Sequence, residues 1–378
     1  MPVLETFRAK VVTSRVSGTD VRVYTVSNDT YRYLVFVPKS DGAFELDQPG
    51  TWILRRRASD GGLDQIKVFL RGHEDFFLRI FPAGTGRSAM SVFLAGTEIH
   101  SRLPIPADLL DVLQMPLADL LSLVAQRIEW AHFYPSVDPS AYRSVELASE
   151  RARSMLHTLP DAEDGAMDEN GQLVFIESLV LQDQQPGFNC SGFAKWVADG
   201  LAIATLGRYL EIEPLKQKHL EYRGTGHTRA FEDERDPYFG LDWTRNIALS
   251  LRGEPTDGSS DPEVADVRAV PYAHYVEDAG YSLSDVPLVL FMEAAMNPGH
   301  IYLASLSRQF GSAPALHQHV HVAVLFPYID EHGTFRVDVM ERNVESSLAS
   351  LQRRYADGRM HLVRVLAHDQ FSPPVILH

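Results

Sequence analysis

The chain's single cysteine, Cys190, lies where a helix is expected to begin. It stands in the run Asn189-Cys190-Ser191-Gly192-Phe193, just after the turn-forming pair Pro186-Gly187. Asn189 is a good N-cap, and apolar residues then recur at helical spacing, namely Phe193, Val197, Leu201 and Ala204. The unpaired N–H groups and positive dipole end of a helix N-terminus stabilise a thiolate and can hold an oxyanion. We therefore expect Cys190 to be a nucleophile; the alternative is a small buried hydrophobic residue.

Two alternating apolar runs downstream predict a β-hairpin that carries a histidine. They span 320–326 and 335–340 and are joined by the turn-like Glu331-His332-Gly333. If the turn centres on His332, cross-strand partners lie equally far from it, so Leu325 faces Val339 and His321 faces Asn343. His321 would then be a general base that the Asn343 amide orients. Glu341, on the same face, is the competing third member.

The order of these residues agrees with a papain-type arrangement. His321 lies 131 residues after Cys190, and Asn343 lies 153 residues after it. The oxyanion of such an enzyme is held by the N–H of the nucleophile and by a side-chain amide upstream. Gln184 occupies the corresponding position, with Gln185 and Gln182 as alternatives. Asn189 is the other polar candidate next to the thiol.

The motif Asn189-Cys190-Ser191-Gly192-Phe193, with Trp196, resembles the Asp-Cys-Ser-Gly-hydrophobic signature of NlpC-type cell-wall cysteine peptidases, and the strand from His321 to Val324 resembles their His-Val-Gly-Ile strand. The resemblance covers residues 172–368. It implies an α+β, papain-like catalytic domain in which the nucleophile helix packs on an antiparallel sheet. It also implies cleavage of peptidoglycan stem or cross-link peptides by a thiol hydrolase without a cofactor.

Carried over to this chain, the resemblance makes Cys190 the nucleophile, His321 the base and Asn343 the orienting residue. Asn189 replaces the usual aspartate, Ala323 replaces the usual glycine, and the gap between Cys190 and His321 is longer than is typical of the family. A location in the cell envelope or outside the cell follows from the resemblance; without it, the cytoplasm is the expectation.

Composition indicates an ordinary globular protein of two or three domains. The chain has 378 residues, of which 45% are hydrophobic and 22% charged. The net charge of −15 disfavours a nucleic-acid or anionic-membrane surface. The apolar run 286–292 is too short to cross a membrane, and the first ten residues do not resemble a signal peptide. The oligomeric state is left open.

The order of patterns predicts three regions. Seven short β-rich runs between residues 10 and 94 favour a sandwich or barrel, so 1–110 is expected to be a β-rich accessory domain. Helical patterns near 117–130 and 141–159 make 111–160 a helical linker. An acidic, glycine-containing stretch at 160–172 marks the boundary of a peptidase domain at 161–378.

Residues 207–281 are expected to be an insertion within the peptidase domain. Such long segments often form lids or clefts, and Tyr238, Asp242 and Trp243 are candidate cleft residues, with a place in the core as the alternative. The run Gly224-Thr225-Gly226 lacks the lysine and the preceding strand of a phosphate loop.

Two other functions are open. His317, His319 and His321 are spaced two residues apart, so on a regular strand they would share one face. With His300 or Glu341 as a further ligand, they could bind the zinc of a hydrolase. The spacing matches no zinc motif, so we expect no metal. The second alternative is a non-catalytic peptide-binding or cell-wall-binding module that keeps the fold.

Overall fold

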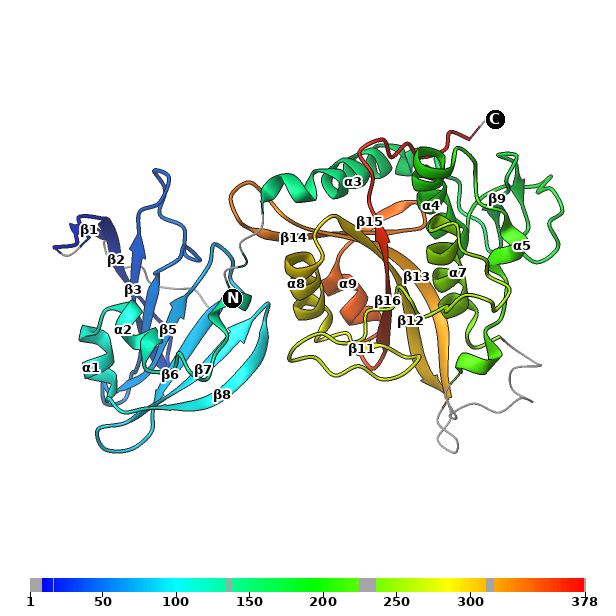
Figure 1. Ribbon diagram of the computed structural model, residues 1–378. Helices are drawn as coiled ribbons and strands as arrows, with labels where there is room; N and C mark the ends of the chain where they lie inside the picture. Colours follow the sequence, from blue (N-terminus) through cyan, green and yellow to red (C-terminus); the bar gives the residue numbers. More distant parts are fainter. Residues whose placement is uncertain are drawn as a thin grey trace. The chain divides into compact units, whose positions relative to one another are not determined.

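A computed structural model describes residues 9–376 apart from 16, 134, 136, 137, 224–235 and 311–315 (Figure 1). The chain forms two compact units, Met1–Ser136 and Val137–His378. The division therefore falls inside the expected helical linker 111–160 and not at 160–172. The helices of this region do not form one linker. Those at 109–114 and 117–122 belong to the N-terminal unit, whereas the helix at 143–155 packs in the core of the C-terminal unit.

The N-terminal unit is built on one antiparallel sheet of eight strands paired in chain order. Alternate residues of its central strands are fully buried, including Ile66, Leu78 and Met90, which is the period-two pattern of a sheet with one face in the core. The strands are β1 (Lys10–Thr13), β2 (Asp20–Ser27), β3 (Tyr31–Pro38), β4 (Trp52–Arg57), β5 (Leu63–Phe69), β6 (Phe77–Pro82), β7 (Ser88–Leu94) and β8 (Thr97–Ile105). The helices α1 (Leu109–Gln114), α2 (Leu117–Ser122) and η1 (Trp130–His132) follow.

Of the two expected architectures, a sandwich or a barrel, the two-sheet sandwich does not form, because the eight strands join one continuous meander. All seven expected runs are strands, and β8 is an additional one. Its sequence, Thr97-Glu98-Ile99-His100-Ser101-Arg102-Leu103-Pro104-Ile105, is mostly polar, and its register against β7 shifts twice. Irregular pairing and low apolar content hide such a strand from a periodicity argument.

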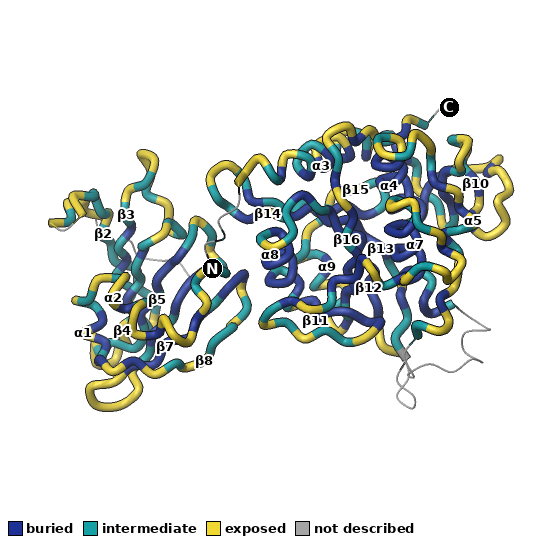
Figure 2. The backbone as a smooth tube through the Cα atoms, viewed as in Figure 1, coloured by how far each residue is buried: buried dark blue, intermediate teal, exposed yellow. Residues whose placement is uncertain are grey.

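The C-terminal unit is a mixed α/β structure around a six-stranded antiparallel sheet, in the order β11-β16-β12-β13-β14-β15. The middle parts of its central strands β12, β13 and β16, residues 301–307, 322–327 and 360–363, are continuously buried (Figure 2). The strands of the sheet are β11 (Tyr281–Ser282), β12 (His300–Phe310), β13 (Leu316–Ile329), β14 (Phe335–Glu341), β15 (Val344–Ser346) and β16 (Arg359–Leu366). A separate small pair consists of β9 (Ala166–Met167) and β10 (Leu173–Val174).

Helices cover both faces of this sheet (Figure 1). One face, with Leu303, Val322 and Val324, forms a single apolar core with α3 (Arg143–Met155), α4 (Cys190–Leu206) and α7 (Phe239–Leu251). On the other face lies α8 (Val286–Met296), where the Tyr302 hydroxyl donates to Glu293 at 3.1 Å. In the described part of this unit the other helices are α5 (Ile212–Leu215), α9 (Leu348–Arg354), η2 (Pro139–Tyr142), η3 (Leu156–Thr158) and η4 (Leu220–Tyr222).

The region expected to be an insertion, 207–281, contributes α7 to the main core and is not a peripheral lid. Residues 224–235, including Gly224-Thr225-Gly226, lie outside the described residues. Within the described ranges, none of the helices has both the length and the apolar character needed to span a bilayer.

Candidate active site

Helix α4 begins at Cys190 for identifiable local reasons. The Asn189 side chain accepts a hydrogen bond from the Gly192 N–H at 2.8 Å, as an N-cap does. Its backbone N–H donates to the Gly165 carbonyl at 3.1 Å, which ties the helix start to the strand β9. A Cβ at Gly192 would collide with that same carbonyl. The glycine of the Cys-Ser-Gly motif is thus required by close backbone packing beside the thiol.

The hairpin of β13 and β14 has the expected register. Leu325 pairs with Val339, and the Asp330 N–H donates to the Thr334 carbonyl at 3.0 Å across the turn. These two observations confirm the prediction that the turn centres on His332. The register holds as far as the pair Val324–Met340, where the pairing of the two strands ends.

The prediction that Asn343 is the partner of His321 is wrong. Strand β14 stops at Glu341, and the chain turns back into β15 through Arg342, whose φ is +50°. Asn343 therefore lies in a tight turn, and its amide donates to the Leu159 carbonyl at 3.1 Å. The extrapolated pairing with His321 fails because the strand that would carry it has already ended.

Glu341, the competing candidate, is the residue that contacts His321. The distance between its Oε2 and the Nε2 of His321 is 2.6 Å, and both side chains are almost buried. Its other oxygen accepts from the Arg354 guanidinium, and Ser346 also donates to this carboxylate. The Tyr355 ring stacks on the imidazole, with centroids 5.9 Å apart and planes 11° from parallel. The histidine is therefore held both along its edge and across its face.

Cys190 interacts with the same imidazole, and the hydrogen bond and charge between the two groups lower the pKa of the thiol and raise that of His321. Since Nε2 is taken by Glu341, Nδ1 is the ring nitrogen left for the thiol. The backbone N–H of Val322 also donates to the sulfur. Because the β13–β14 pairing ends at Val324, this part of β13 has an open edge at which the sulfur can lie. The three side chains form the chain Cys190–His321–Glu341.

The pKa values of the three groups favour a charge-separated pair. Burial raises the pKa of the Cys190 thiol, but the hydrogen bond and charge of His321 and the Val322 N–H outweigh it, so the net shift is downward. Burial lowers the pKa of His321, but Cys190 and Glu341 raise it by more, so its pKa is about 9. Burial raises the pKa of Glu341, and His321, Arg354 and Ser346 together lower it to about 2. At neutral pH this arrangement favours a thiolate, an imidazolium and a carboxylate.

The side-chain amides expected to help hold an oxyanion are not available for that role. Gln184 is exposed and makes no hydrogen bond among the described residues. Gln182 is buried, but its amide donates to the Asp164 carbonyl at 2.7 Å and accepts from the Gly187 N–H at 2.6 Å, so it holds the preceding loop. Asn189 is used as the helix cap. The donors left for an oxyanion are the backbone N–H groups of Cys190 and Ser191 at the start of α4. They precede the Gly192 N–H, which the Asn189 side chain already caps.

A pocket of about 530 Å³ opens beside the histidine. His321, Glu341 and Tyr355 form part of its wall, and charged residues of both signs complete it: Asp161, Glu345, Arg342 and Arg354. Arg342 donates to both oxygens of Asp161, at 2.9 and 3.1 Å. The pocket therefore offers a polar wall with charges of both signs beside His321, part of it already paired as Arg342–Asp161.

The expected cleft residues Tyr238, Asp242 and Trp243 are instead parts of the core, each at most 3% exposed. The Trp243 indole donates to the Ser191 carbonyl at 2.9 Å, which joins α7 to the start of α4. Asp242 accepts from Arg223 at 2.8 Å. Their burial leaves none of the three side chains able to line a cleft, and among them Trp243 has a hydrogen bond to the helix that carries the thiol.

The arrangement of histidines expected for zinc is also wrong. Leu306 pairs with His321, but the next residue, Ser307, pairs with His319, so Val320 is the extra residue of a β-bulge. The bulge places His319 and His321 on opposite faces. His319 is hydrogen-bonded to Ser305 at 2.8 Å, and burial lowers its pKa to about 3. No cluster of three or more metal-ligating side chains occurs in the described part of the chain.

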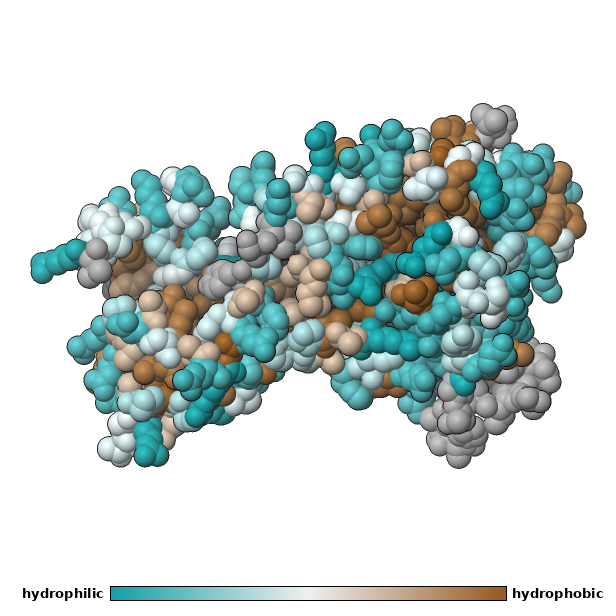
Figure 3. Space-filling view, viewed as in Figure 1, coloured by the Kyte–Doolittle hydropathy of each residue, from teal (hydrophilic) through white to brown (hydrophobic). Residues whose placement is uncertain are grey.

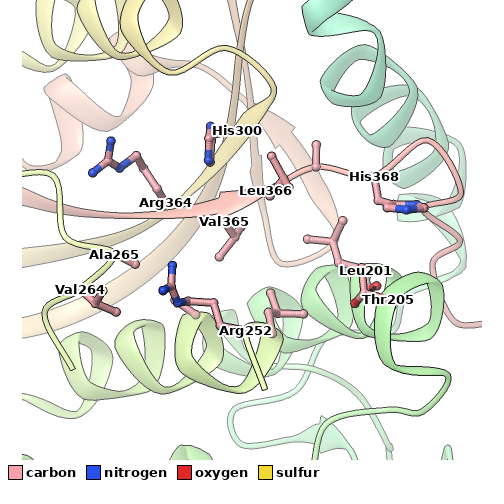
Figure 4. Close-up of a pocket in the computed structure, with 13 residues that line it drawn as sticks. Leu201, Thr205, Arg252, Val264, Ala265, His300, Arg364, Val365, Leu366 and His368 are labelled. Atoms are coloured by element: carbon pink, nitrogen blue, oxygen red, sulfur yellow. Dashed lines mark hydrogen bonds between the residues drawn. The ribbon is translucent and has the colours of Figure 1, made fainter. Parts of the chain in front are cut away.

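His300, the other expected zinc ligand, lies at the far end of β12, where it pairs with Leu366, roughly 20 Å along the strand from Leu306. A second pocket, of about 380 Å³, lies there beside the C-terminal half of α4. Figure 4 shows His300 and Arg364 on one side of β16 and Arg252 on the other. The positive groups do not converge on one point, and this pocket is separate from Cys190.

Three residues around the site were not anticipated from the sequence: Arg342, Arg354 and Tyr355. None belongs to a motif, and Arg354 and Tyr355 come from the end of α9, which no expected contact linked to His321.

Exposed hydrophobic side chains also occur before α4, in the loop with Leu179, Val180 and Leu181. Hydrophobic side chains reach the surface on the β9–β10 side of the unit (Figure 3).

Comparison with known proteins gives one partial match. A family model described as a domain of unknown function (DUF8515) matches residues 4–132, which is 129 of the 378 residues. That segment lies within the N-terminal unit, whereas Cys190, His321 and Glu341 all lie in the C-terminal unit. No curated protein and no solved structure matches the chain. Arguments about activity therefore depend on the site itself.

Proposed function

We propose that the C-terminal unit is a cysteine-dependent amidase or peptidase of papain-like architecture. The observation that carries the proposal is the continuous chain of hydrogen bonds Cys190–His321–Glu341, with the thiol at a helix N-terminus. A lone cysteine or a buried histidine would not require this combination. The packing of α4 on an antiparallel sheet that carries the histidine supports the papain-like assignment.

In the proposed reaction, the Cys190 thiolate attacks the carbonyl carbon of an amide. A carbon–sulfur bond forms, and the N–H groups at the start of α4 stabilise the negative oxygen. The imidazolium of His321 gives its Nδ1 proton to the leaving nitrogen as the carbon–nitrogen bond breaks. Neutral His321 then removes a proton from water, which attacks the thioester and releases the acid. Glu341 keeps the ring oriented and stabilises the imidazolium in both steps.

Peptidoglycan peptides are the proposed substrates. The wall of the pocket beside His321 carries Arg342, Arg354, Asp161 and Glu345. Each of them is already in an ion pair within the protein, so the ammonium and carboxylate groups of a bound peptide would exchange with these pairs. The resemblance of the motif around Cys190 to the NlpC-type signature favours the same class of substrate.

The test is digestion of purified peptidoglycan and soluble muropeptides, with mass spectrometry of the products. Wild type is compared with Cys190→Ala, His321→Ala and the control His332→Ala, which removes an exposed histidine from the hairpin turn. We expect new amine and acid termini with wild type and the control, and none with the two site variants. A covalent acyl adduct on Cys190 should appear in intact-mass spectra. Activity that persists in Cys190→Ala would refute the mechanism, and wild type inactive on every muropeptide would refute the substrate.

A further inference from the structure

The end of α9 packs against the catalytic histidine and its carboxylate, and nothing in the triad requires it to do so. Arg354 is the last residue of α9, and Tyr355 follows it. The first contacts Glu341 and the second covers His321. Arg308, at the end of β12, joins the same cluster. We propose that Arg308, Arg354 and Tyr355 form a positioning clamp that holds the His321–Glu341 pair in its reactive orientation. This inference rests on the proposed function.

The Tyr355 ring is the part of the clamp that restricts the imidazole. Its plane is 11° from that of His321, with a centroid separation of 5.9 Å, so the rings are stacked and offset. The imidazole is bonded at Cγ and hydrogen-bonded at its nitrogens, so the motion left to it is a small tilt by rotation about the Cβ–Cγ bond. A second ring across its face opposes that tilt. Tyr355 thus supplies a restraint that neither Cys190 nor Glu341 can provide.

Arg308 holds the tyrosine from β12. Its guanidinium lies 4.6 Å from the centre of the Tyr355 ring, and its Nη2 donates to the Arg354 carbonyl at 2.5 Å. A cation near the last carbonyls of a helix is favourable, and a cation over an aromatic ring adds to it. The end of α9 is therefore fixed to the strand that neighbours the His321 strand.

Arg354 fixes the carboxylate. Its guanidinium donates to the Glu341 oxygen that does not face His321, and it lies 5.5 Å from the Tyr355 ring. A carboxylate held at one oxygen keeps the other directed at the imidazole. Without Arg354, the Glu341 side chain can turn away from His321 Nε2 toward the adjacent pocket. The clamp therefore acts on catalysis through Glu341 and His321, without touching the reacting atoms.

The experiment measures alkylation of Cys190 by iodoacetamide at pH 6 and pH 9, followed by mass spectrometry of the single thiol. The variants are Tyr355→Leu, which removes the ring, and Arg354→Met, which removes the donor. Tyr355→Phe and Arg354→Lys are conservative counterparts. The control is Arg353→Gln, which removes the same charge from the adjacent, exposed position on α9. Thermal melting of each variant checks that the unit remains folded.

In Tyr355→Leu and Arg354→Met, we expect the rate at pH 6 to fall about tenfold, with the rate at pH 9 within about twofold of wild type. The thiol ionises at pH 9 without help from the imidazolium, so the effect is confined to low pH. Tyr355→Phe and Arg353→Gln should match wild type, and Arg354→Lys should recover part of the pH 6 rate. A general loss of folding would change both rates.

The outcomes separate this inference from the proposed function. If His321→Ala abolishes the pH 6 reactivity but Tyr355→Leu and Arg354→Met behave like Arg353→Gln, the clamp is refuted and the proposed function stands. If wild-type Cys190 reacts only near the pH at which an ordinary thiol ionises, both fail together.

Discussion

Replacing Glu341 with glutamine tests whether the carboxylate, and not the Asn343 amide, supports the histidine. Glutamine keeps the size of the side chain and can still accept from His321 Nε2, so the main change is loss of the negative charge. A hydrogen bond to a charged group contributes about 1.5–3 kcal/mol, roughly twice a neutral one. The expected loss is therefore about 1–1.5 kcal/mol of support for the imidazolium, which corresponds to about a tenfold change. The pair is almost buried, so solvent screening reduces this little.

The direction of the effect follows from the pKa shifts. The pKa of His321 is raised to about 9, against burial, by Cys190 and Glu341, so in wild type the imidazolium persists through neutral pH. In Glu341→Gln the pKa of His321 should fall, and the thiolate that depends on it should form only at higher pH. Iodoacetamide alkylation of Cys190 at pH 6 should slow about tenfold, and the two proteins should converge near pH 9.

Asn343→Ala is the matched control for this experiment. The Asn343 amide donates to the Leu159 carbonyl, whereas the carboxylate of Glu341 contacts His321, so removal of the amide should leave the pH profile of alkylation unchanged. The substitution should only lower the free energy of unfolding, by about 1 kcal/mol for the one hydrogen bond lost. The reasoning is refuted if Glu341→Gln alkylates as wild type does, or if Asn343→Ala shows the larger loss at pH 6.

Three further predictions concern the supports of the site. Gly192→Ala should lower the free energy of unfolding by about 1–3 kcal/mol and slow alkylation, because the new methyl collides with the Gly165 carbonyl; an unchanged melting curve would contradict this. Lys195→Met should lower the free energy of unfolding by about 3–5 kcal/mol in chemical denaturation, since it removes the counter-ion 2.8 Å from the fully buried Asp199 carboxylate and leaves it the Leu210 N–H as a donor; a change below about 1 kcal/mol would be inconsistent. Because burial lowers the pKa of His319 to about 3, the unfolded state binds its proton first, so the free energy of unfolding should fall as pH drops from about 6.5 toward 3. His319→Asn should flatten that dependence, and an identical slope in both proteins would exclude His319 as its source.

Local pattern was sufficient for much of the site. Asn189 as the cap, Cys190 as the first residue of α4 and the hairpin register around His332 were all predicted. Helix caps and hairpin turns involve residues close in sequence, so their geometry is set by short-range hydrogen bonds and side-chain alternation. The same reasoning placed seven of the eight strands in the N-terminal unit.

Predictions failed where long-range packing ends or interrupts an element. Strand β14 stops at Glu341 because the following turn is held by Asp161 on Arg342 and by Leu159 on Asn343, about 180 residues away in sequence. The bulge at Val320 turns His319 to the other face of the sheet, where Ser305 and the Asp278 carbonyl hold it. Trp243 is in the core because α7 packs against α4. None of these contacts leaves a periodic signal in the chain.

The residue types alone therefore indicated a thiol at a helix start and a histidine on a strand, since each depends on neighbours within a few positions. Which polar group meets that histidine depended on where β14 ends, and which groups hold the pair depended on the approach of α9 and β12. Those are properties of the packed unit. A turn or a bulge of one residue moves the following side chains to the opposite face of the sheet, and so small a change in the alternation of residues is not visible in the sequence.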